Sequence, residues 1–423
     1  IHEDLKNNVT TYDLTELIDF KKLGFEKAIS INAKKKVKVV SKYPIVKLTT
    51  LTNDIINGST PLKSENSYWL KKEVPWITVP DFPESNLYVD STSQFVSQKA
   101  IDDKKVKLIP ENSVLISCTA TIGKVCINKV KLTTNQQINS IICNTEKVVV
   151  EYLGYYLKFN GYKLAYLTNN PGVLHVNQQM LNSFPIPLPP KTEQEKIIAE
   201  IEAVEQKEKA GKEKVVSLRQ DISAVINRAS GTATKLKVIT SKIGSGATPK
   251  GGNSSYQSSG ISLIRSQNIY DYGFVEKGLA FINDDQAKKL DNVTVEKNDV
   301  LFNITGASIA RCCIVPEEYL PARVNQHVSI IRTNDKAIPK YVQMVLVSAE
   351  YKNQLLQIGE GATSRQAITK QQLEEFKIPV PSIPEQQKIV DEINKLETEI
   401  TQIETELATM DEQKEQILKK HLE

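Results

Sequence analysis

The sequence has few cysteines and histidines and no long hydrophobic run. Its five cysteines form no Cys-x-x-Cys pair and its four histidines are scattered, so the sequence predicts neither a disulfide framework nor a zinc site. No apolar stretch is long enough to cross a membrane, and no stretch has the pattern of a signal peptide. We therefore expect a cytoplasmic protein with reduced thiols and no membrane association.

Sequence motifs for catalysis are also missing. An Asn/Asp-Pro-Pro-aromatic loop, which would hold a target adenine, does not occur; the nearest string is "NNPGVL" at Asn169. "GSGATPKGG", residues 244–252, lacks the Gly-Lys-Ser/Thr ending of a phosphate-binding loop. Pro80-Asp81 with Asp102-Asp103-Lys104 spells a magnesium-nuclease pattern, but the second half of the chain has no counterpart. We therefore predict no catalytic residue, no metal and no cofactor in this chain.

The bulk composition is that of an ordinary globular protein. The 423 residues carry a formal charge of +4, with 40% hydrophobic and 25% charged residues. This length predicts two to three domains, and the mildly basic charge is compatible with a nucleic-acid partner without demanding one.

The most informative feature is an internal repeat. "IPLPPKTEQEKIIAEIEAVEQ" at residues 186–206 matches "IPVPSIPEQQKIVDEINKLET" at residues 378–398 without a gap. Three more pairs of matching segments precede these helix starts, in the same order in both halves of the chain. They are the two Gly-x-Thr-Pro turns near Gly58 and Gly246, "SVLISCTATIGKVCI" with "DVLFNITGASIARCCI", and "TTNQQINSII" with "ARVNQHVSIIR". Collinear matches of this kind indicate two copies of one unit.

Each copy begins with a part that is rich in short β-branched runs separated by Gly, Asn and Pro. Such runs ("SVLIS", "KVCI", "SIIC", "ISLIR", "CCIV", "VSIIR") are typical of short strands. Helical stretches are mixed in at residues 150–159 and 340–358. The sequence therefore predicts an α+β fold with a β-rich domain in each copy.

Each copy ends with a long helix of about 30 residues whose apolar positions alternate in steps of four and three. This is the spacing of a coiled-coil seam. The predicted seam residues are Ile197, Ile201, Val204, Val215, Leu218, Ile222, Ile389, Ile393, Leu396, Ile400, Ile403 and Leu407; Glu208 and Lys414 are polar residues at the same spacing. Glu193 and Glu385 fall in the first turn, where a carboxylate suits the helix dipole.

Two arrangements of these helices are compatible with the pattern. Each helix could lie on its own domain, or the two could pair with each other as an antiparallel coiled coil with pseudo-two-fold symmetry. We favour pairing. The predicted boundaries are residues 1–42 for an N-terminal connector, 43–189 and 236–381 for the β-rich domains, and 190–235 and 382–423 for the helical regions.

From about Tyr43 onward, this order of motifs resembles the specificity subunit of a Type I restriction–modification system. The resemblance rests on the duplicated Pro-x-Pro…Glu-Gln…Ile helix start, the Gly-x-Thr-Pro turns and the Asn-Gln of "TNQQ" and "VNQH". It implies two target-recognition domains, each reading one half of a bipartite double-stranded DNA site. It also implies assembly with adenine-N6 methyltransferase (M) subunits and restriction (R) subunits, which would use S-adenosylmethionine, ATP and Mg. The subunit itself would catalyse nothing.

The N-terminal segment departs from that pattern. "TTYDLTELIDFKKLGFEKAISINAKKKVKVVSKYPIVKL" resembles the connector between an adenine methyltransferase and its recognition region in fused enzymes. The chain is thus either a separate subunit with a divergent N-terminal helix or the recognition region of a fused methyltransferase–endonuclease. Both interpretations stay open.

Candidate DNA-contacting residues lie in loops rich in Gly, Ser and Asn, because small residues let backbone approach phosphate while amide and basic side chains read base edges. "GEGATSRQAIT" is the strongest such loop, and "NPGVLHVNQQ" is its counterpart. The predicted residues are Lys63, Asn66, Tyr68, Lys71, Lys72, His175, Asn177, Gln178, Lys250, Asn253, Tyr256, Arg265, Gln267, Asn268, Ser364, Arg365 and Gln366.

Overall fold

The computed structural model describes residues 37–84, 86–168, 174–271, 273–360 and 366–423. The chain divides into two compact units, which we call unit 1 (up to residue 210, with 407–423) and unit 2 (residues 211–406). The predicted connector, residues 1–42, lies outside the described residues except for its last six positions.

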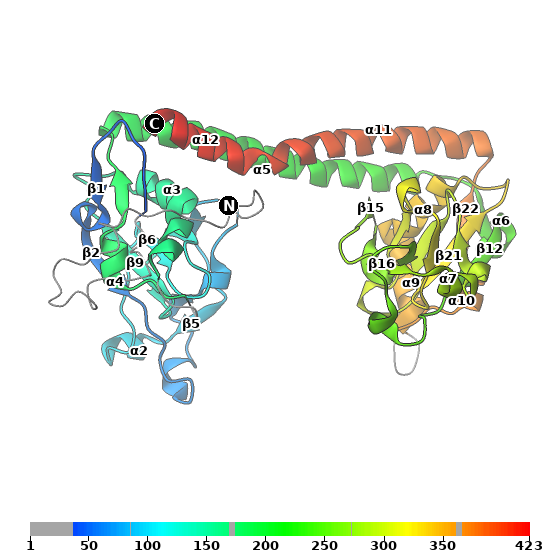
Figure 1. The fold of residues 1–423 in the computed structure, drawn as a ribbon, viewed down its shortest axis with the longest axis horizontal. Coiled ribbons are helices and arrows are strands. Elements are labelled where there is room, and N and C mark those ends of the chain that lie inside the picture. Colours follow the sequence, from blue (N-terminus) through cyan, green and yellow to red (C-terminus); the bar gives the residue numbers. More distant parts are fainter. Residues whose placement is uncertain (1–36, 85, 169–173, 272, 361–365) are drawn as a thin grey trace, which may run out of the picture. The chain divides into compact units, whose positions relative to one another are not determined.

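Unit 1 contains a five-stranded sheet in the order β2-β9-β6-β7-β4 and a three-stranded sheet in the order β5-β3-β8 (Figure 1). The strands of the larger sheet are β2 (Thr52–Asn57), β9 (Ile138–Cys143), β6 (Val114–Ser117), β7 (Val125–Asn128) and β4 (Tyr88–Val89). Those of the smaller sheet are β5 (Gln94–Val96), β3 (Val74–Ile77) and β8 (Thr133–Thr134). The short helices α2 (Gln98–Asp102) and α4 (Gln178–Asn182) and the longer α3 (Val150–Asn160) complete the unit, with β1 (Ile45–Lys47) paired to β10 (Pro185–Pro187).

Unit 2 has the matching sheets β12-β21-β18-β19 and β16-β13-β20-β17. The first is built from β12 (Thr240–Ser245), β21 (Val328–Thr333), β18 (Val300–Asn303) and β19 (Cys312–Ile314). The second is built from β16 (Ala280–Ile282), β13 (Ile261–Ile264), β20 (Ala322–Val324) and β17 (Thr294–Val295). The unit also holds the strand pairs β14 (Ile269–Tyr270) with β15 (Gly273–Phe274) and β11 (Thr232–Lys235) with β22 (Lys377–Val380), and the helices α6 (Leu236–Ile239), α7 (Asp284–Lys288), α8 (Pro339–Val347), α9 (Ala349–Glu360) and α10 (Lys370–Glu375).

The strand orders of the two units agree, except that β4 extends the larger sheet of unit 1 and β17 extends the second sheet of unit 2. The register of β2 on β9 shifts between Thr52 and Asp54, and that of β12 on β21 shifts between Thr240 and Lys242, so the same irregularity recurs at the same place. In both units the two smaller-sheet strands β3 and β8, or β13 and β20, run parallel. The chain is therefore α+β, as the sequence predicts.

The predicted strands are confirmed, and their side chains are buried on both faces of the sheet. In unit 1, Ile116 and Ile127 face a core shared with helix α3, whereas Leu115 and Cys126 face a second core against the smaller sheet. A continuous apolar run is the pattern that a strand covered on both sides requires. The helix expected over residues 340–358 is interrupted at Ser348, whose extended ψ of 147° separates α8 from α9.

The long helices are α5 (Lys191–Asn227), α11 (Ile383–Ala408) and α12 (Met410–Leu422). The second repeat was expected to end in one helix, but Thr409 separates α11 from α12. Thr409 is the N-cap of α12, and its carbonyl accepts from the Gln413 amide. Glu193 and Glu385 lie in the first turns, as predicted.

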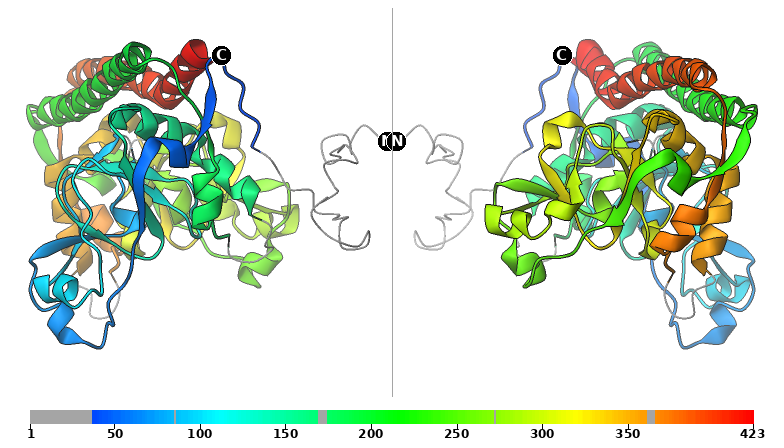
Figure 2. Two further views of the ribbon diagram at one scale, coloured as in Figure 1. Left: turned by 90° about the vertical axis from the view of Figure 1, so that its left-hand side faces the viewer. Right: turned by 90° about the vertical axis from the view of Figure 1, so that its right-hand side faces the viewer.

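Helix α5 runs antiparallel to its neighbour within each unit. In unit 1, α12 lies alongside the first part of α5 (Figure 2), and the pairs Glu208–Lys414 and Glu200–Lys420 show that residue numbers rise along one helix as they fall along the other. In unit 2, α5 pairs with α11 through Arg219–Glu404 and Arg228–Glu392.

The predicted seam residues lie between these helices or against the adjoining domain. Ile197 and Ile201 share a core with Leu418 and Leu422 of α12 and with the domain of unit 1, so the alternatives of pairing and of lying on the domain both hold there. The buried members are Ile197, Ile201, Val204, Val215, Leu218, Ile222, Ile393 and Ile400, and the half-buried ones are Ile389, Leu396, Ile403 and Leu407.

Candidate nucleic-acid interface

The two Gly-x-Thr-Pro turns pack on the two Asn-Gln turns and hold each domain together. Gly58 and Gly246 lie so close to the facing backbone that an added Cβ would sit 2.0 Å from the Asn135 oxygen or 1.7 Å from the Val324 oxygen. The threonine hydroxyls next to them donate to glutamine side chains, Thr60 to Gln136 and Thr248 to Gln326. These motifs are thus a structural clasp shared by both units.

The predicted residues near the first clasp are mostly exposed. Lys63, Asn66, Lys71 and Lys72 have exposed side chains that a polyanion could reach, and Lys71 also lies 4.0 Å from Glu73. Tyr68 is different: it is buried, and its hydroxyl donates to Asp103 at 3.2 Å. It therefore supports the loop from inside.

The second predicted group of unit 1 surrounds the start of α4. Asn177 caps this helix by accepting from the Met180 amide at 2.9 Å, and Gln178 donates to the Ile55 carbonyl at 3.2 Å. His175 is exposed, and its Nδ1 lies 2.9 Å from the Thr119 hydroxyl. All three side chains are exposed, but each also has a partner within the domain, and His175 pairs with Thr119 through a backbone bridge as well.

In unit 2, the side chains of three predicted residues are hydrogen-bonded to other parts of the domain. Asn268 is fully buried, accepts from the Arg265 amide and donates to the Val275 carbonyl at 2.8 Å. Arg265 and Gln267 both donate to the Gly278 carbonyl, and the Arg265 guanidinium lies 5.2 Å from the Tyr256 ring. The amide and guanidinium groups that the sequence suggested for DNA contact therefore form local hydrogen bonds within the domain.

The remaining predicted residues of unit 2 are placed only in part. Lys250 is exposed and Tyr256 half-buried. Asn253 lies in the turn Gly252–Ser255, with its side chain outside what the structure describes; Ser364 and Arg365 also lie outside the described residues. Gln366 is exposed, and its carbonyl accepts from the Gly306 amide at 3.2 Å.

An open hollow adjoins Gln366 in unit 2. It is lined by Ser266, Gln267, Tyr270, Thr305, Gly306, Ala307, Ser308, Arg311 and His327. The Thr305 hydroxyl lies 2.6 Å from Nδ1 of His327, and the Arg311 guanidinium stacks 4.5 Å from the Tyr270 ring centroid. Sequence reasoning missed Tyr270, Thr305 and Arg311. The available signal was the position of Arg311, which follows the Gly-Ala-Ser loop and directly precedes β19.

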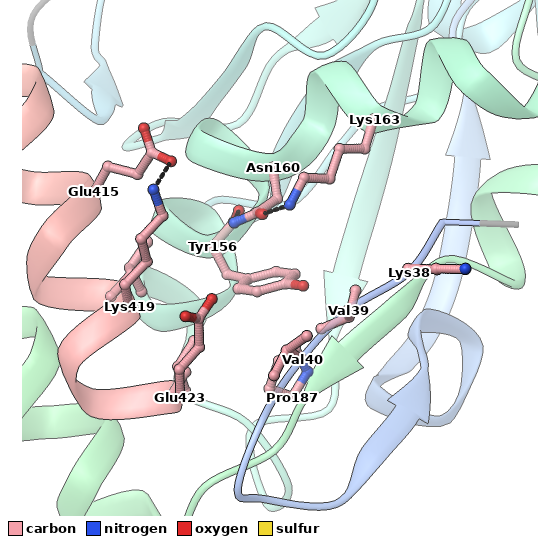
Figure 3. Close-up of a pocket in the computed structure, with 12 residues that line it drawn as sticks. Lys38, Val39, Val40, Tyr156, Asn160, Lys163, Pro187, Glu415, Lys419 and Glu423 are labelled. Carbon is pink, nitrogen blue, oxygen red and sulfur yellow. Dashed lines mark hydrogen bonds and ion pairs between the residues drawn. The ribbon is translucent and has the colours of Figure 1, made fainter. Parts of the chain in front are cut away.

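A second cavity, in unit 1, lies where the chain's two described ends meet. Figure 3 shows Val39, Val40 and Tyr156 around it, with the Glu415–Lys419 ion pair at 2.9 Å on its α12 side. Next to it, the Lys42 amide and the Ser41 hydroxyl donate to the Leu422 carbonyl at 2.8 and 3.0 Å. These bonds cap the C-terminal end of α12. We therefore interpret this cavity as a structural feature and not as a binding site.

Chemistry on the cysteines is disfavoured by their burial. All five are buried and free, and burial raises the pKa of the Cys118 thiol to about 11 and those of Cys143 and Cys313 to about 12. Within the described ranges, no cluster of three or more His, Cys, Asp or Glu could hold a metal ion. No described helix is long and apolar enough to cross a membrane.

Comparison with known proteins identifies the family. Residues 41–217 and 238–409 each match the Type I restriction modification DNA specificity domain. The chain belongs to this family. The predicted resemblance to Type I specificity subunits is thereby confirmed, and the domain occurs twice, once in each repeat.

Individual relatives agree. The chain is 30% identical over 147 residues to a Type I restriction enzyme specificity subunit of Escherichia coli, a match covering 33% of this chain and 36% of that protein. It is 32% identical over 148 residues to the MjaIX specificity subunit of Methanocaldococcus jannaschii, covering 34% of each. The matched segment therefore spans about a third of the length of these curated relatives.

A solved structure shares the fold. A chain from work on complex assembly and conformational transition of the type I R-M system superposes with a TM-score of 0.61 at 16% identity, covering 91% of this chain and 99% of the other. At this identity the likeness concerns the fold alone.

Proposed function

We propose that this chain is the DNA-recognition subunit of a Type I restriction–modification complex, and that each unit reads one half of a bipartite double-stranded DNA site. The observation that carries the proposal is the repetition of one fold, with the same order of the shared strands and the same register shift, in a chain whose family domain also matches twice. Two similar scaffolds with different loops are what a site with two unlike halves requires.

The loops differ while the scaffold is kept. Both units retain the threonine–glutamine clasp, but the exposed groups beside it are Lys63, Lys71 and Lys72 in unit 1 and Lys250 in unit 2. Base-edge contacts specify sequence while phosphate contacts position the protein. Divergence confined to the loops would thus change the half-site without changing the fold.

The long helices form, in this proposal, an antiparallel coiled coil that relates the two repeats by a pseudo-two-fold axis. They act as the spacer between the half-site readers and as the docking surface for adenine-N6 methyltransferase (M) subunits. The antiparallel pairing of α5 with α12 in unit 1 and with α11 in unit 2 supports this role. Restriction (R) subunits join the complex for cleavage.

Catalysis belongs to the partners in this scheme. S-adenosylmethionine would be used by the M subunits, and ATP and Mg by the R subunits. In this chain, the buried thiols and the absence of an adenine-binding Asn-Pro-Pro-aromatic motif support a non-catalytic role.

Methylome sequencing tests the proposal directly. Cells expressing this chain with its M subunit should methylate a two-part motif separated by an undefined gap. A variant in which residues 43–189 are exchanged for the corresponding segment of a relative should change one half of the motif and keep the other. A single continuous motif, or a change in both halves after the exchange, would contradict the proposal.

A further inference from the structure

Arg311 differs from the other arginines that the structure describes. Five of the six described arginines donate side-chain hydrogen bonds to carboxylates or carbonyls: Arg219, Arg228, Arg265, Arg323 and Arg332. For Arg311 the only side-chain interaction among the described residues is its stacking on Tyr270. Its guanidinium donors thus have no protein acceptor there, although the residue is half-buried.

The backbone holds Arg311 in a fixed place at the start of β19. Its carbonyl accepts from the Asn303 amide at 2.8 Å, and its amide donates to the Ser308 carbonyl at 3.2 Å. The Tyr270 ring, 43% exposed, lies 4.5 Å away and supports the plane of the guanidinium. A planar fork that is already oriented loses little entropy when it binds a matching pair of acceptors.

Polar side chains line the hollow around Arg311, and hydrogen bonds hold its rim in place. Asn303, which is fully buried, donates to the Ser266 carbonyl at 2.9 Å and to the Ser308 hydroxyl at 3.1 Å, so it ties together the two loops on either side. Its own Oδ1 has no hydrogen-bond partner among the residues that the structure describes. The lining residues supply hydroxyls and His327 but no carboxylate, and the nearby Asp271 is paired with Lys352.

We propose that Arg311, supported by Tyr270, reads a guanine in the half-site bound by unit 2. This inference rests on the proposed DNA-recognition function and names a residue that determines its specificity. Guanine presents O6 and N7 side by side in the major groove, which matches the two parallel donors of a guanidinium. Hydroxyl groups beside Arg311 can donate or accept, as contacts to neighbouring base edges demand.

Unit 1 carries a different cation at the matching position. The Ser117 amide donates to the Lys124 carbonyl at 2.9 Å, as the Asn303 amide does to that of Arg311, and Lys124 is exposed. Lysine is a flexible point charge that cannot offer a fixed pair of donors. The two units therefore present unlike groups at the same place, in keeping with unlike half-sites.

The test uses the chain reconstituted with its M subunit and a panel of duplexes that carry single-base changes in both halves of the motif found by methylome sequencing. Arg311→Ala should weaken binding of the cognate duplex about 5- to 150-fold, the range of one bidentate arginine–guanine contact. Preference should relax at one G·C pair of one half only. Arg311→Lys should lose the same preference because it keeps the charge without the fork. Tyr270→Leu should weaken the contact in part.

A modified base sharpens the assignment. Replacing the guanine at that position by 7-deazaguanine removes the N7 acceptor, so the unaltered protein should lose affinity and the Arg311→Ala variant should not. Arg228→Ala, which removes an exposed charge paired with Glu392 in the same unit, is the matched control and should leave base preference unchanged.

Three other results would overturn the inference. Equal loss on all duplexes with a salt slope reduced by about one would make Arg311 a phosphate contact. No change in Arg311→Ala would leave it without a role in binding. A reconstituted complex of the unaltered chain without sequence preference would overturn the proposed function itself and this inference with it.

Discussion

At the scale of single residues, the repeated Glu-Gln of the two helix starts has a structural explanation. Gln194 and Gln386 are fully buried. Each side-chain oxygen accepts a backbone amide from the domain, Val149 or Ile338, at 2.8 Å, and each side-chain nitrogen donates to a proline carbonyl just before the helix. One amide thus satisfies a donor and an acceptor that would otherwise be buried without partners, and it joins the helix to the domain.

Removing this amide should destabilise unit 2. Gln386→Leu keeps the approximate volume but leaves the Ile338 amide and the Pro381 carbonyl without that partner, so we expect a loss of about 1–3 kcal/mol in the free energy of unfolding. Urea denaturation measures it. Gln387→Leu is the control, because this neighbouring side chain is exposed and donates to the exposed Asp391. Equal effects of the two substitutions would show that the joint contributes nothing.

The sequence predicted the repetition of these residues but not their role. Glu193 and Glu385 were expected in the first turn from the helix dipole alone, because that effect depends only on neighbours in sequence. The bonds of Gln386 reach Ile338 and Lys336, about fifty positions away in the chain. Long-range partners of this kind leave no local pattern. Asn268, predicted to face DNA, is buried for a different reason, since its amide is held by local hydrogen bonds to Arg265 and Val275.

At the scale of elements, the helix pair of unit 1 contains a buried ion pair. The Lys414 side chain is 0% exposed and lies 2.6 Å from Glu208, with Asp411 at 3.0 Å. Burial alone would lower the pKa of Lys414, but its hydrogen bonds to Glu208 and Asp411 carry that pKa above its ordinary value. Both residues occupy seam positions, where a polar pair favours one alignment of the helices over others.

Removing one partner of this ion pair should destabilise the fold more than replacing both partners by apolar residues. Lys414→Met removes the buried ammonium group that lies 2.6 Å from the Glu208 carboxylate, so we expect a loss of about 3 kcal/mol in unfolding free energy. Combining Lys414→Met with Glu208→Leu should recover most of that loss, since an apolar seam needs no compensation. Lys419→Met, which removes an exposed pair with Glu415, is the control and should cost less than about 1 kcal/mol. A double variant as unstable as the single one would show that the pair does more than neutralise charge.

Element types were the most predictable level of the fold. The apolar runs at β6, β7, β9, β13, β19 and β21 were recognised as strands, and the helical spacing located α5 and α11, because burial leaves a regular trace in sequence. The breaks at Ser348 and Thr409 were not foreseen. Neither residue is a proline or a glycine, so neither position carried a helix-breaking signal.

At the scale of the whole molecule, one helix belongs to both units. Helix α5 has 37 residues, which is about 55 Å at 1.5 Å per residue, and the chain passes from unit 1 to unit 2 within it at residue 210. The order of motifs in the sequence was enough to predict two copies of one domain and their family. The recognised base sequence was not predictable, because it depends on how each loop docks against DNA.

If the paired helices set the spacing of the half-sites, lengthening them should lengthen the gap. We propose to insert four residues after Ala210 in α5 and four after Glu406 in α11, where the chain passes between the units. Four residues add about 6 Å and one turn, a change that helix pairs absorb by local unwinding. That rise corresponds to one or two base pairs of duplex. Methylome sequencing should therefore return both half-sites unchanged with a gap longer by that amount.

The control for this experiment replaces four residues at each of the same points by alanine without changing the length, and its gap should equal that of the unaltered chain. An insertion in α5 alone shifts its seam against α12 or α11, so it should abolish specific methylation instead of producing a new gap. An unchanged gap in the double insertion would mean that loops or partner subunits, and not the helices, determine the spacing. Recovery of both half-sites shows that each unit is still folded and reads DNA. An unchanged gap would therefore count against the helices as a spacer and not against DNA recognition by the units.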